Sequence, residues 1–123
     1  MPAVTWNGAT ADWNTPSDWS NGIGPGLGDT AVLPAASAYT VTISSNETTT
    51  VTSVLITGSA ATLGLHNSSG SGHGASLTVH GGFSNNGTLY VDAFSGEGGS
   101  SLTVDGTLAN TGIAVTGPGN LNL

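Results

Sequence analysis

The chain has 123 residues, of which 6% are charged; lysine and arginine are absent, and the formal net charge is -7. This length fits one domain with a modest core, and the missing basic residues exclude nucleic acids and anionic membranes as partners, because their phosphates are bound by Lys and Arg. Cysteine is absent, which excludes disulfides and thiolate metal sites. No apolar run approaches the ~20 residues that span a bilayer, so we expect no membrane insertion.

Residues 1–38 are the first predicted element, a cap at the N-terminal end. This segment carries all three tryptophans, Trp6, Trp13 and Trp19, and four of the five prolines. A stack of coils needs an atypical terminal unit to cover its first coil, and large aromatic side chains suit that purpose. We predict that residues 1–38 cap a stack of coils formed by residues 39–123, within a single structural domain.

Short runs of alternating apolar residues, bounded by Gly, Asn, Ser or Pro, follow one another along the chain. This pattern is typical of β-strands, and no segment has helical periodicity with capping residues. The sequence therefore predicts an all-β protein. The predicted strands are residues 30–33, 39–43, 51–56, 62–65, 77–79, 88–91, 102–104 and 113–115.

A repeat of 25 residues marks the C-terminal third, where SLTVHGGFSNNGTLYV (76–91) is followed by SLTVDGTLANTGIAVT (101–116). Repeats of roughly 20 to 50 residues indicate solenoids, in which each unit buries its apolar face against its neighbours. We predict a β-solenoid, a short parallel β-helix with about 25 residues per coil. The matched pairs are Leu77 and Leu102, Val79 and Val104, Phe83 and Leu108, Asn85 and Asn110, and Gly87 and Gly112.

The alternation within the repeat predicts which side chains point into the solenoid. Thr78, Thr88 and Thr103 are expected to face outward, because threonine suits an exposed strand face without charge. The side chains expected inside are Leu77, Val79, Phe83, Leu89, Val91, Leu102, Val104, Leu108, Ile113 and Val115.

The C-terminal residues GPGNLNL look like the beginning of a further strand. An uncovered coil presents unpaired N–H and C=O groups that can pair with another chain. GPGNLNL contains no charged residue that would discourage such pairing. We therefore predict an open C-terminal end. The predicted assembly interface consists of Leu121, Asn122 and Leu123 at this end and Trp6 at the other.

Two groups of residues together resemble a known class of protein. TWNGATADWNTPSDWSNGIGPGLGDTAVLP (5–34), then YTVTIS (39–44), then strands of the type SLTVDGTLANTG (101–112), are similar to the N-terminal segments of secreted or surface β-solenoid proteins of alphaproteobacteria. These are related to autotransporter passengers and filamentous-haemagglutinin-like adhesins. The resemblance covers essentially the whole chain and implies a right-handed parallel β-helix outside the cell or on its surface. Relatives are usually longer, so the chain is either a fragment or a small subunit that regains length by stacking.

The tryptophans and aspartates each allow two interpretations. Trp6, Trp13 and Trp19 either form a buried cap, which we favour, or an exposed platform for glycan contact. Asp12, Asp18 and Asp29 are expected to accept hydrogen bonds in turns. Calcium binding by these carboxylates is the less favoured alternative, and we otherwise predict no cofactor and no metal site.

His66, His73 and His80 are each seven positions apart, a spacing that sends neighbours on a strand to opposite faces. We expect solvated histidines in turns. His80 and Asp105 are partners in the 25-residue repeat, so stacking of coils is expected to bring them together.

We expect a non-enzymatic, extracellular structural protein whose copies stack head-to-tail into a filament or matrix element. No phosphate-binding loop or serine-hydrolase elbow is found. The main alternative is a carbohydrate-binding adhesin module of a larger surface protein, with polysaccharide as partner. An ice-binding surface is a weaker alternative, because regular T-x-T ranks are expected for it and only Thr40 to Thr42 has that pattern.

Overall fold

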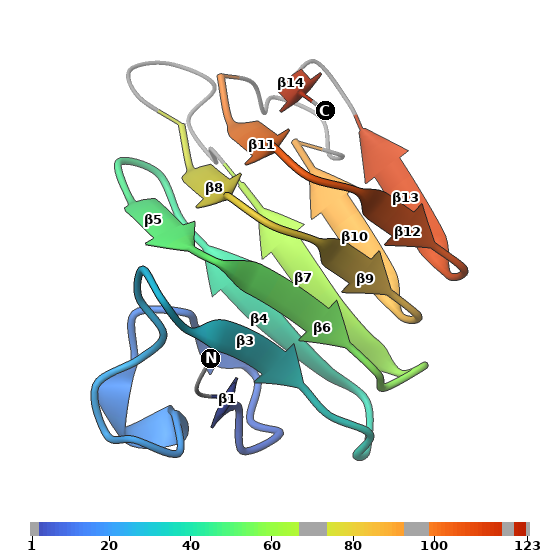
Figure 1. The fold of residues 1–123 in the computed structure, drawn as a ribbon. Coiled ribbons are helices and arrows are strands. Elements are labelled where there is room, and N and C mark those ends of the chain that lie inside the picture. Colours follow the sequence, from blue (N-terminus) through green and yellow to red (C-terminus); the bar gives the residue numbers. More distant parts are fainter. Residues whose placement is uncertain (1–2, 67–73, 93–98, 117–119, 123) are drawn as a thin grey trace.

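A computed structural model describes residues 3–66, 74–92, 99–116 and 120–122 (Figure 1). Parallel strands in these residues form three sheets that run along a common stack, with the N-terminus at one end and the C-terminal strand at the other. The first sheet contains β1 (Ala3–Thr5), β3 (Thr30–Leu33), β6 (Ser53–Ile56), β9 (Phe83–Asn85) and β12 (Leu108–Asn110). The second contains β2 (Ala11–Asp12), β4 (Tyr39–Ile43), β7 (Ala61–Leu65), β10 (Thr88–Val91) and β13 (Ile113–Thr116). The third contains β5 (Thr48–Val51), β8 (Ser76–Val79), β11 (Ser101–Val104) and β14 (Asn120–Asn122).

From β3 onward the chain visits the three sheets in turn, so that each coil places one new strand on each sheet, whereas the first coil contributes only β1 and β2. The strand register gives the length of a coil directly. Phe83 pairs with Leu108, which is 25 residues later, whereas Val54 pairs with Phe83, 29 residues later. The predicted fold class, an all-β parallel β-helix with about 25 residues per coil, is confirmed.

Side chains alternate between the inside and the outside of the stack because successive residues of a strand point to opposite faces. In β8 and β11, both with the sequence SLTV, Leu and Val are fully buried, and Ser and Thr are partly exposed. The predicted inward positions that are buried are Leu77, Val79, Phe83, Leu89, Val91, Leu102 and Val104. Leu108 is only partly buried.

Ile113 was predicted to point inward, and this prediction is wrong. Ile113 pairs with Thr88, whose side chain faces outward, and it is 59% exposed. Ala114, the next residue, takes the register position of the buried Leu89. Val115 pairs with Tyr90 along the backbone, and the direction of its side chain lies outside what the structure describes.

Asparagine and glycine form the corners between the first and second sheets. Asn85 is fully buried, and its Nδ2 donates to Asn110 Oδ1 at 2.8 Å and to the carbonyl of Ile113 at 3.1 Å. Its Oδ1 accepts from the N–H of Gly87 at 3.0 Å. A Cβ on Gly87 would lie 2.3 Å from the carbonyl oxygen of Ala61, so only glycine fits where successive coils approach this closely.

The N-terminal strands already belong to the stack. β1 pairs with β3, and β2 pairs with β4, so the coils begin inside the segment predicted as a cap. Residues 13–29, which include the 3-10 helix η1 (Pro16–Asp18), connect β2 to β3. We call residues 13–29 the cap loop; it carries Trp13 and Trp19.

Candidate functional site

The three indoles form one buried cluster near the N-terminal end. The ring centroid of Trp19 lies 4.9 Å from that of Trp6 and 4.9 Å from that of Trp13, both in edge-to-face arrangements, which are favoured for aromatic pairs. The indole N–H of Trp6 donates to the carbonyl of Ala9, and that of Trp19 donates to the carbonyl of Trp13, each at 2.7 Å. Each of these two N–H groups therefore has a partner inside the protein.

Burial of these rings corrects two of the predicted site assignments. Trp6, Trp13 and Trp19 are 1%, 2% and 3% exposed, so none offers a ring face on which a sugar can stack. Trp6 also cannot contribute its side chain to an assembly interface, because the cap loop covers it through Trp19. Burial of a large apolar ring is favourable, which explains why the cluster lies inside.

Asp12 and Asp29 accept hydrogen bonds in turns, as predicted, whereas Asp18 accepts from a side chain 11 residues away in the sequence. Asp12 Oδ1 accepts from the N–H of Asn14 at 2.8 Å, and Asp29 Oδ2 accepts from the N–H of Gly26 at 2.9 Å. Asp18 Oδ1 accepts from Asn7 Nδ2 at 2.9 Å. Within the described ranges, no group of three or more His, Asp or Glu side chains is arranged to hold a metal ion.

Strands β12, β13 and β14 make up the last described rung of the stack, and each lies at the edge of its sheet (Figure 1). No described strand covers this rung, and Ala114 on β13 is exposed. Leu63 on β7 and Leu89 on β10 have the same register position in the two preceding coils, a position that we call a column, and they are 0% and 1% exposed. Leu121 and Asn122 lie on β14, paired with Leu102 and Thr103. These two residues therefore lie on the last described strand of the third sheet, whereas Leu123 lies outside the described residues.

The cap loop at the other end also exposes apolar side chains. Ile23 is 78% exposed and Leu27 is 72% exposed, the highest values among the large hydrophobic residues described. The N–H of Gly28, next to Leu27, donates to Thr52 Oγ1 at 2.8 Å, which ties this part of the loop to the corner between β5 and β6. Both ends of the described stack thus carry exposed apolar residues.

His80 and Asp105 meet at the corner between the third and first sheets. His80 Nδ1 lies 2.9 Å from Asp105 Oδ2, and both side chains are about half exposed, at 49% and 51%. The predicted proximity of these repeat partners is confirmed. His66 follows β7 and is partly buried, and His73 lies outside the described residues.

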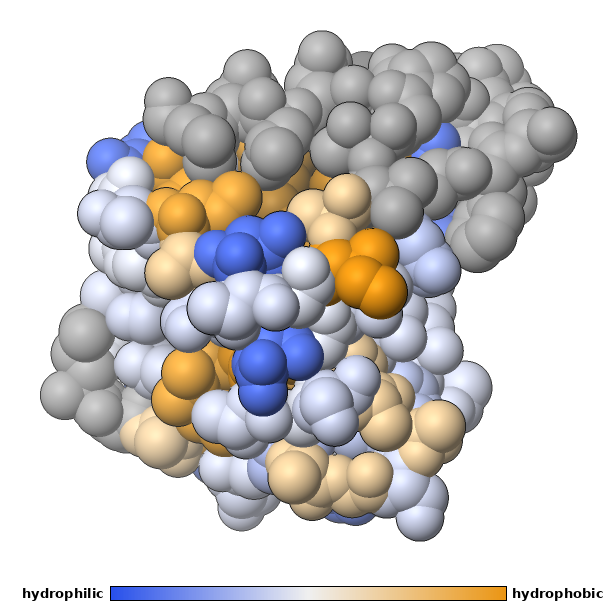
Figure 2. Space-filling model, turned by 90° about the vertical axis from the view of Figure 1, so that its right-hand side faces the viewer, coloured by the Kyte–Doolittle hydropathy of each residue, from blue (hydrophilic) through white to orange (hydrophobic). Residues whose placement is uncertain are grey.

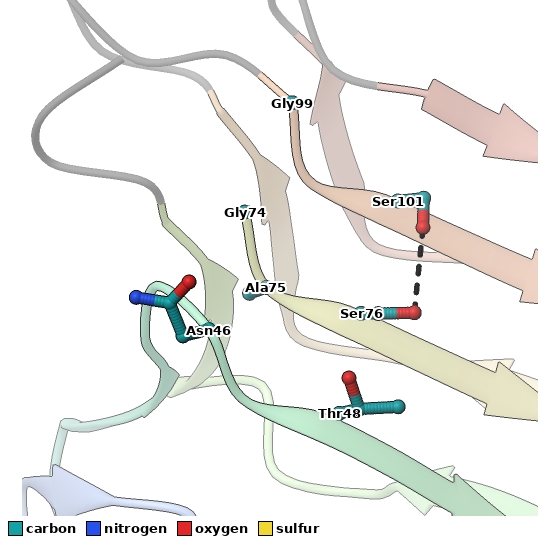
Figure 3. Close-up of a pocket in the computed structure, with 7 residues that line it drawn as sticks. All are labelled: Asn46, Thr48, Gly74, Ala75, Ser76, Gly99 and Ser101. Carbon is teal, nitrogen blue, oxygen red and sulfur yellow. Dashed lines mark hydrogen bonds between the residues drawn. The ribbon is translucent and has the colours of Figure 1, made fainter. Parts of the chain in front are cut away.

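A polar pocket lies at the corner where the chain enters the third sheet (Figure 3). Its volume is about 610 Å³, and its lining includes Thr48, Ser76 and Ser101, which stand on the successive strands β5, β8 and β11. Asn46, on the turn between β4 and β5, lies at its rim, and its carboxamide turns away from the three hydroxyl residues in Figure 3. Sequence reasoning missed this pocket, although the hydroxyl residues Ser76 and Ser101 are 25 positions apart in the repeat.

Few strongly hydrophilic residues are visible on the described part of the face in Figure 2, where intermediate hydropathy predominates. The described residues include no helix that is both long and apolar enough to cross a membrane. Comparison with family models, with curated proteins and with solved structures gives no match. The functional argument therefore rests on the surfaces described above.

Proposed function

We propose that this protein is an extracellular structural subunit whose copies stack head-to-tail into a filament or matrix element. The observation that supports this most directly is the exposure of Ala114, which occupies a column that is buried in the preceding rungs. An added layer would bury this position and pair the free edges of β12, β13 and β14, both of which favour association.

The chemistry of the last rung favours such pairing. The strand sequences LAN, IAVT and NLN contain no charged residue and no proline. Charges and prolines at sheet edges are the features that normally prevent one sheet from adding to another. The described strands of this rung therefore lack both features.

The cap loop supplies the second half of the contact. Ile23 and Leu27 project apolar side chains into solvent there, while the indoles beneath them remain buried. A contact between the last rung of one copy and the cap loop of the next is heterologous, and such contacts generate open filaments when the rotation does not close. This arrangement needs no rearrangement of the tryptophan cluster.

The extracellular assignment is part of the same proposal. A surface rich in Gly, Ser, Thr and Asn with no Lys or Arg is free of trypsin cleavage sites. The resemblance of residues 5–34 to secreted solenoid proteins supports the assignment further.

Sedimentation velocity on a matched set of variants tests this function. Ala114→Lys places a charge on the last rung, Leu27→Lys places one on the cap loop, and Thr62→Lys places one in the middle of a lateral face. We expect the first two variants to be folded monomers and the third to polymerise like the wild type. Polymerisation of Ala114→Lys to the wild-type extent would contradict the proposal.

A further inference from the structure

We propose that the polar pocket at the entry to the third sheet binds a neutral oligosaccharide. The pocket has a volume of about 610 Å³ and lies along the third sheet, between the turn that contacts the cap loop through Asn14 and the strand β11, which pairs with β14. Its polar groups are the hydroxyls of Thr48, Ser76 and Ser101 and the carboxamide of Asn46. These are the groups that recognise sugar hydroxyls, because each hydroxyl both donates and accepts and an amide offers both a donor and an acceptor.

The three hydroxyl residues form a regular column along the stack. Thr48 pairs with Ser76, and Ser76 pairs with Ser101, so the column advances by one strand spacing of ~4.8 Å per coil. Their neighbours Leu77 and Leu102 point into the core, which holds the hydroxyls on the outer face. A ligand with a linear series of hydroxyls can follow such a column, with one sugar facing each rung or every second rung.

The backbone of these strands is already satisfied, which leaves the side chains for a ligand. The N–H of Ser76 donates to the carbonyl of Glu47 at 2.9 Å, and the N–H of Ser101 donates to the carbonyl of Ala75 at 2.8 Å. Ser101 Oγ lies 3.5 Å from Ser76 Oγ, longer than the 2.5–3.0 Å typical of a hydroxyl pair, so this contact is weak (Figure 3). A ligand hydroxyl can replace it with little loss.

The wall of the pocket is held in place by close contacts between two coils. A Cβ on Gly74 would lie 2.4 Å from the backbone nitrogen of Ser100, so the chain needs glycine there. Ser100 is fully buried; its Oγ accepts from the N–H of Ala75 at 3.0 Å, and its N–H donates to Asp92 Oδ2 at 2.7 Å. These contacts join the two coils at the described part of the wall.

The rim residue Asn46 sits in a turn that fixes its position. The N–H of Glu47 donates to the carbonyl of Ser44 at 3.1 Å, which closes the turn, and Asn46 has a φ of 66°, a left-handed conformation that asparagine tolerates. The carboxylate of Glu47 accepts from the N–H of Ser44 and from Asn14 Nδ2. Glu47 is thereby held by protein donors, and it is not among the residues that line the pocket.

Charge decides which class of saccharide is accepted. None of the described residues that line the pocket is charged, and the whole chain has a net charge of -7 without a single Lys or Arg. An acidic glycan would be repelled and would find no cation to pair with. The pocket therefore favours neutral sugars, recognised by hydrogen bonds rather than by stacking on the buried tryptophans.

Isothermal titration of the whole chain with cellohexaose, mannohexaose and chitohexaose tests this site, with hexagalacturonate as the acidic comparison. We expect at least one neutral hexamer to bind and hexagalacturonate not to bind. The double variant Thr48→Val, Ser76→Ala should weaken binding at least tenfold. The matched variant Thr62→Val, which removes a hydroxyl from a different face, should leave it unchanged, and circular dichroism should show that both variants are folded.

Three results would overturn the proposal: no binding of any neutral hexamer, equal binding of hexagalacturonate, or equal loss of affinity in Thr62→Val and in the double variant. Shaping of ice crystals by a chain that binds no hexamer would reassign the hydroxyl column to ordered water. Binding is read from the heat of titration and assembly from sedimentation of Ala114→Lys, so either test can fail while the other succeeds.

Discussion

His80 Nδ1 lies 2.9 Å from Asp105 Oδ2, although 25 residues separate them in the sequence. The backbone explains the contact: the N–H of His80 donates to the carbonyl of Val51, and the N–H of Asp105 donates to the carbonyl of Val79. Each residue thus occupies the same corner in successive coils. The pair connects two coils at the surface of a chain that has no Lys or Arg for other ion pairs.

A double-mutant cycle of His80→Gln and Asp105→Asn measures this contact. Because both side chains are about half exposed, we expect a coupling energy below about 1 kcal/mol. Urea unfolding of the wild type, the two single variants and the double variant provides the measurement. A coupling energy well above about 1 kcal/mol would contradict the expectation.

Tyr39 makes the stability of the fold sensitive to alkaline pH. Burial raises the pKa of its phenol to about 12, and its hydroxyl donates to the carbonyl of Pro34 at 2.7 Å. Above pH ~10 the unfolded chain releases the phenol proton while the folded chain keeps it. The free energy of unfolding should therefore fall as the pH rises from about 10 through about 12.

The variant Tyr39→Phe is the control for this effect. It removes the titrating group, so the fall in stability over the same pH range should become smaller, although the variant also loses one hydrogen bond at every pH. Denaturant midpoints measured on both sides of pH ~10 distinguish the two contributions. An identical pH dependence in the variant and the wild type would assign the effect to another group.

Glycine is required at the inner corner between the first and second sheets. A Cβ at position 87 would lie 2.3 Å from the carbonyl oxygen of Ala61, so Gly87→Ala should cost about 1–3 kcal/mol. Gly82→Ala is the matched change, because its Cβ would meet the carbonyl of Thr107 at 3.7 Å, an ordinary contact. Thermal unfolding should give a lower midpoint temperature for Gly87→Ala than for Gly82→Ala. Equal midpoint temperatures would show that the two coils are further apart at residue 87 than the structure has them.

Burial of the indoles predicts that acrylamide quenches tryptophan fluorescence far less in the native chain than in the chain unfolded by urea. Trp19 contacts both other indoles, so Trp19→Ala should cost about 3–5 kcal/mol. Saccharides that bind the polar pocket should leave the emission maximum unchanged. Strong quenching in the native state would instead place an indole at the surface.

The strands of the regular coils could be predicted from the sequence because alternation and the repeat agree there. Residues 30–33, 39–43 and 88–91 were predicted as strands with the bounds that the structure has. The repeat also paired His80 with Asp105 correctly. At Ile113 the two signals disagree. The repeat aligns Ile113 with the outward-facing Thr88, whereas its hydrophobicity suggests an inward position. The structure follows the register of the repeat, so the side chain of Ile113 faces outward.

Features that depend on contacts between coils could not be read in this way. Residues 51–56 look like one strand, but the chain changes sheets at Thr52, whose N–H donates to the carbonyl of Asp29. The polar pocket was missed because coil lengths vary: Thr48 pairs with Ser76, 28 residues later, outside the 25-residue period. The exposed side chains Ile23 and Leu27 lie in the cap loop, which has no periodicity.

Electron microscopy of the purified chain over a range of concentrations tests the central claim most directly. We expect filaments that lengthen with concentration and have an axial repeat of about four to five strand spacings of ~4.8 Å each, because the sheets contain five, five and four strands. Single particles of one subunit at every concentration would contradict head-to-tail assembly through the last rung and the cap loop.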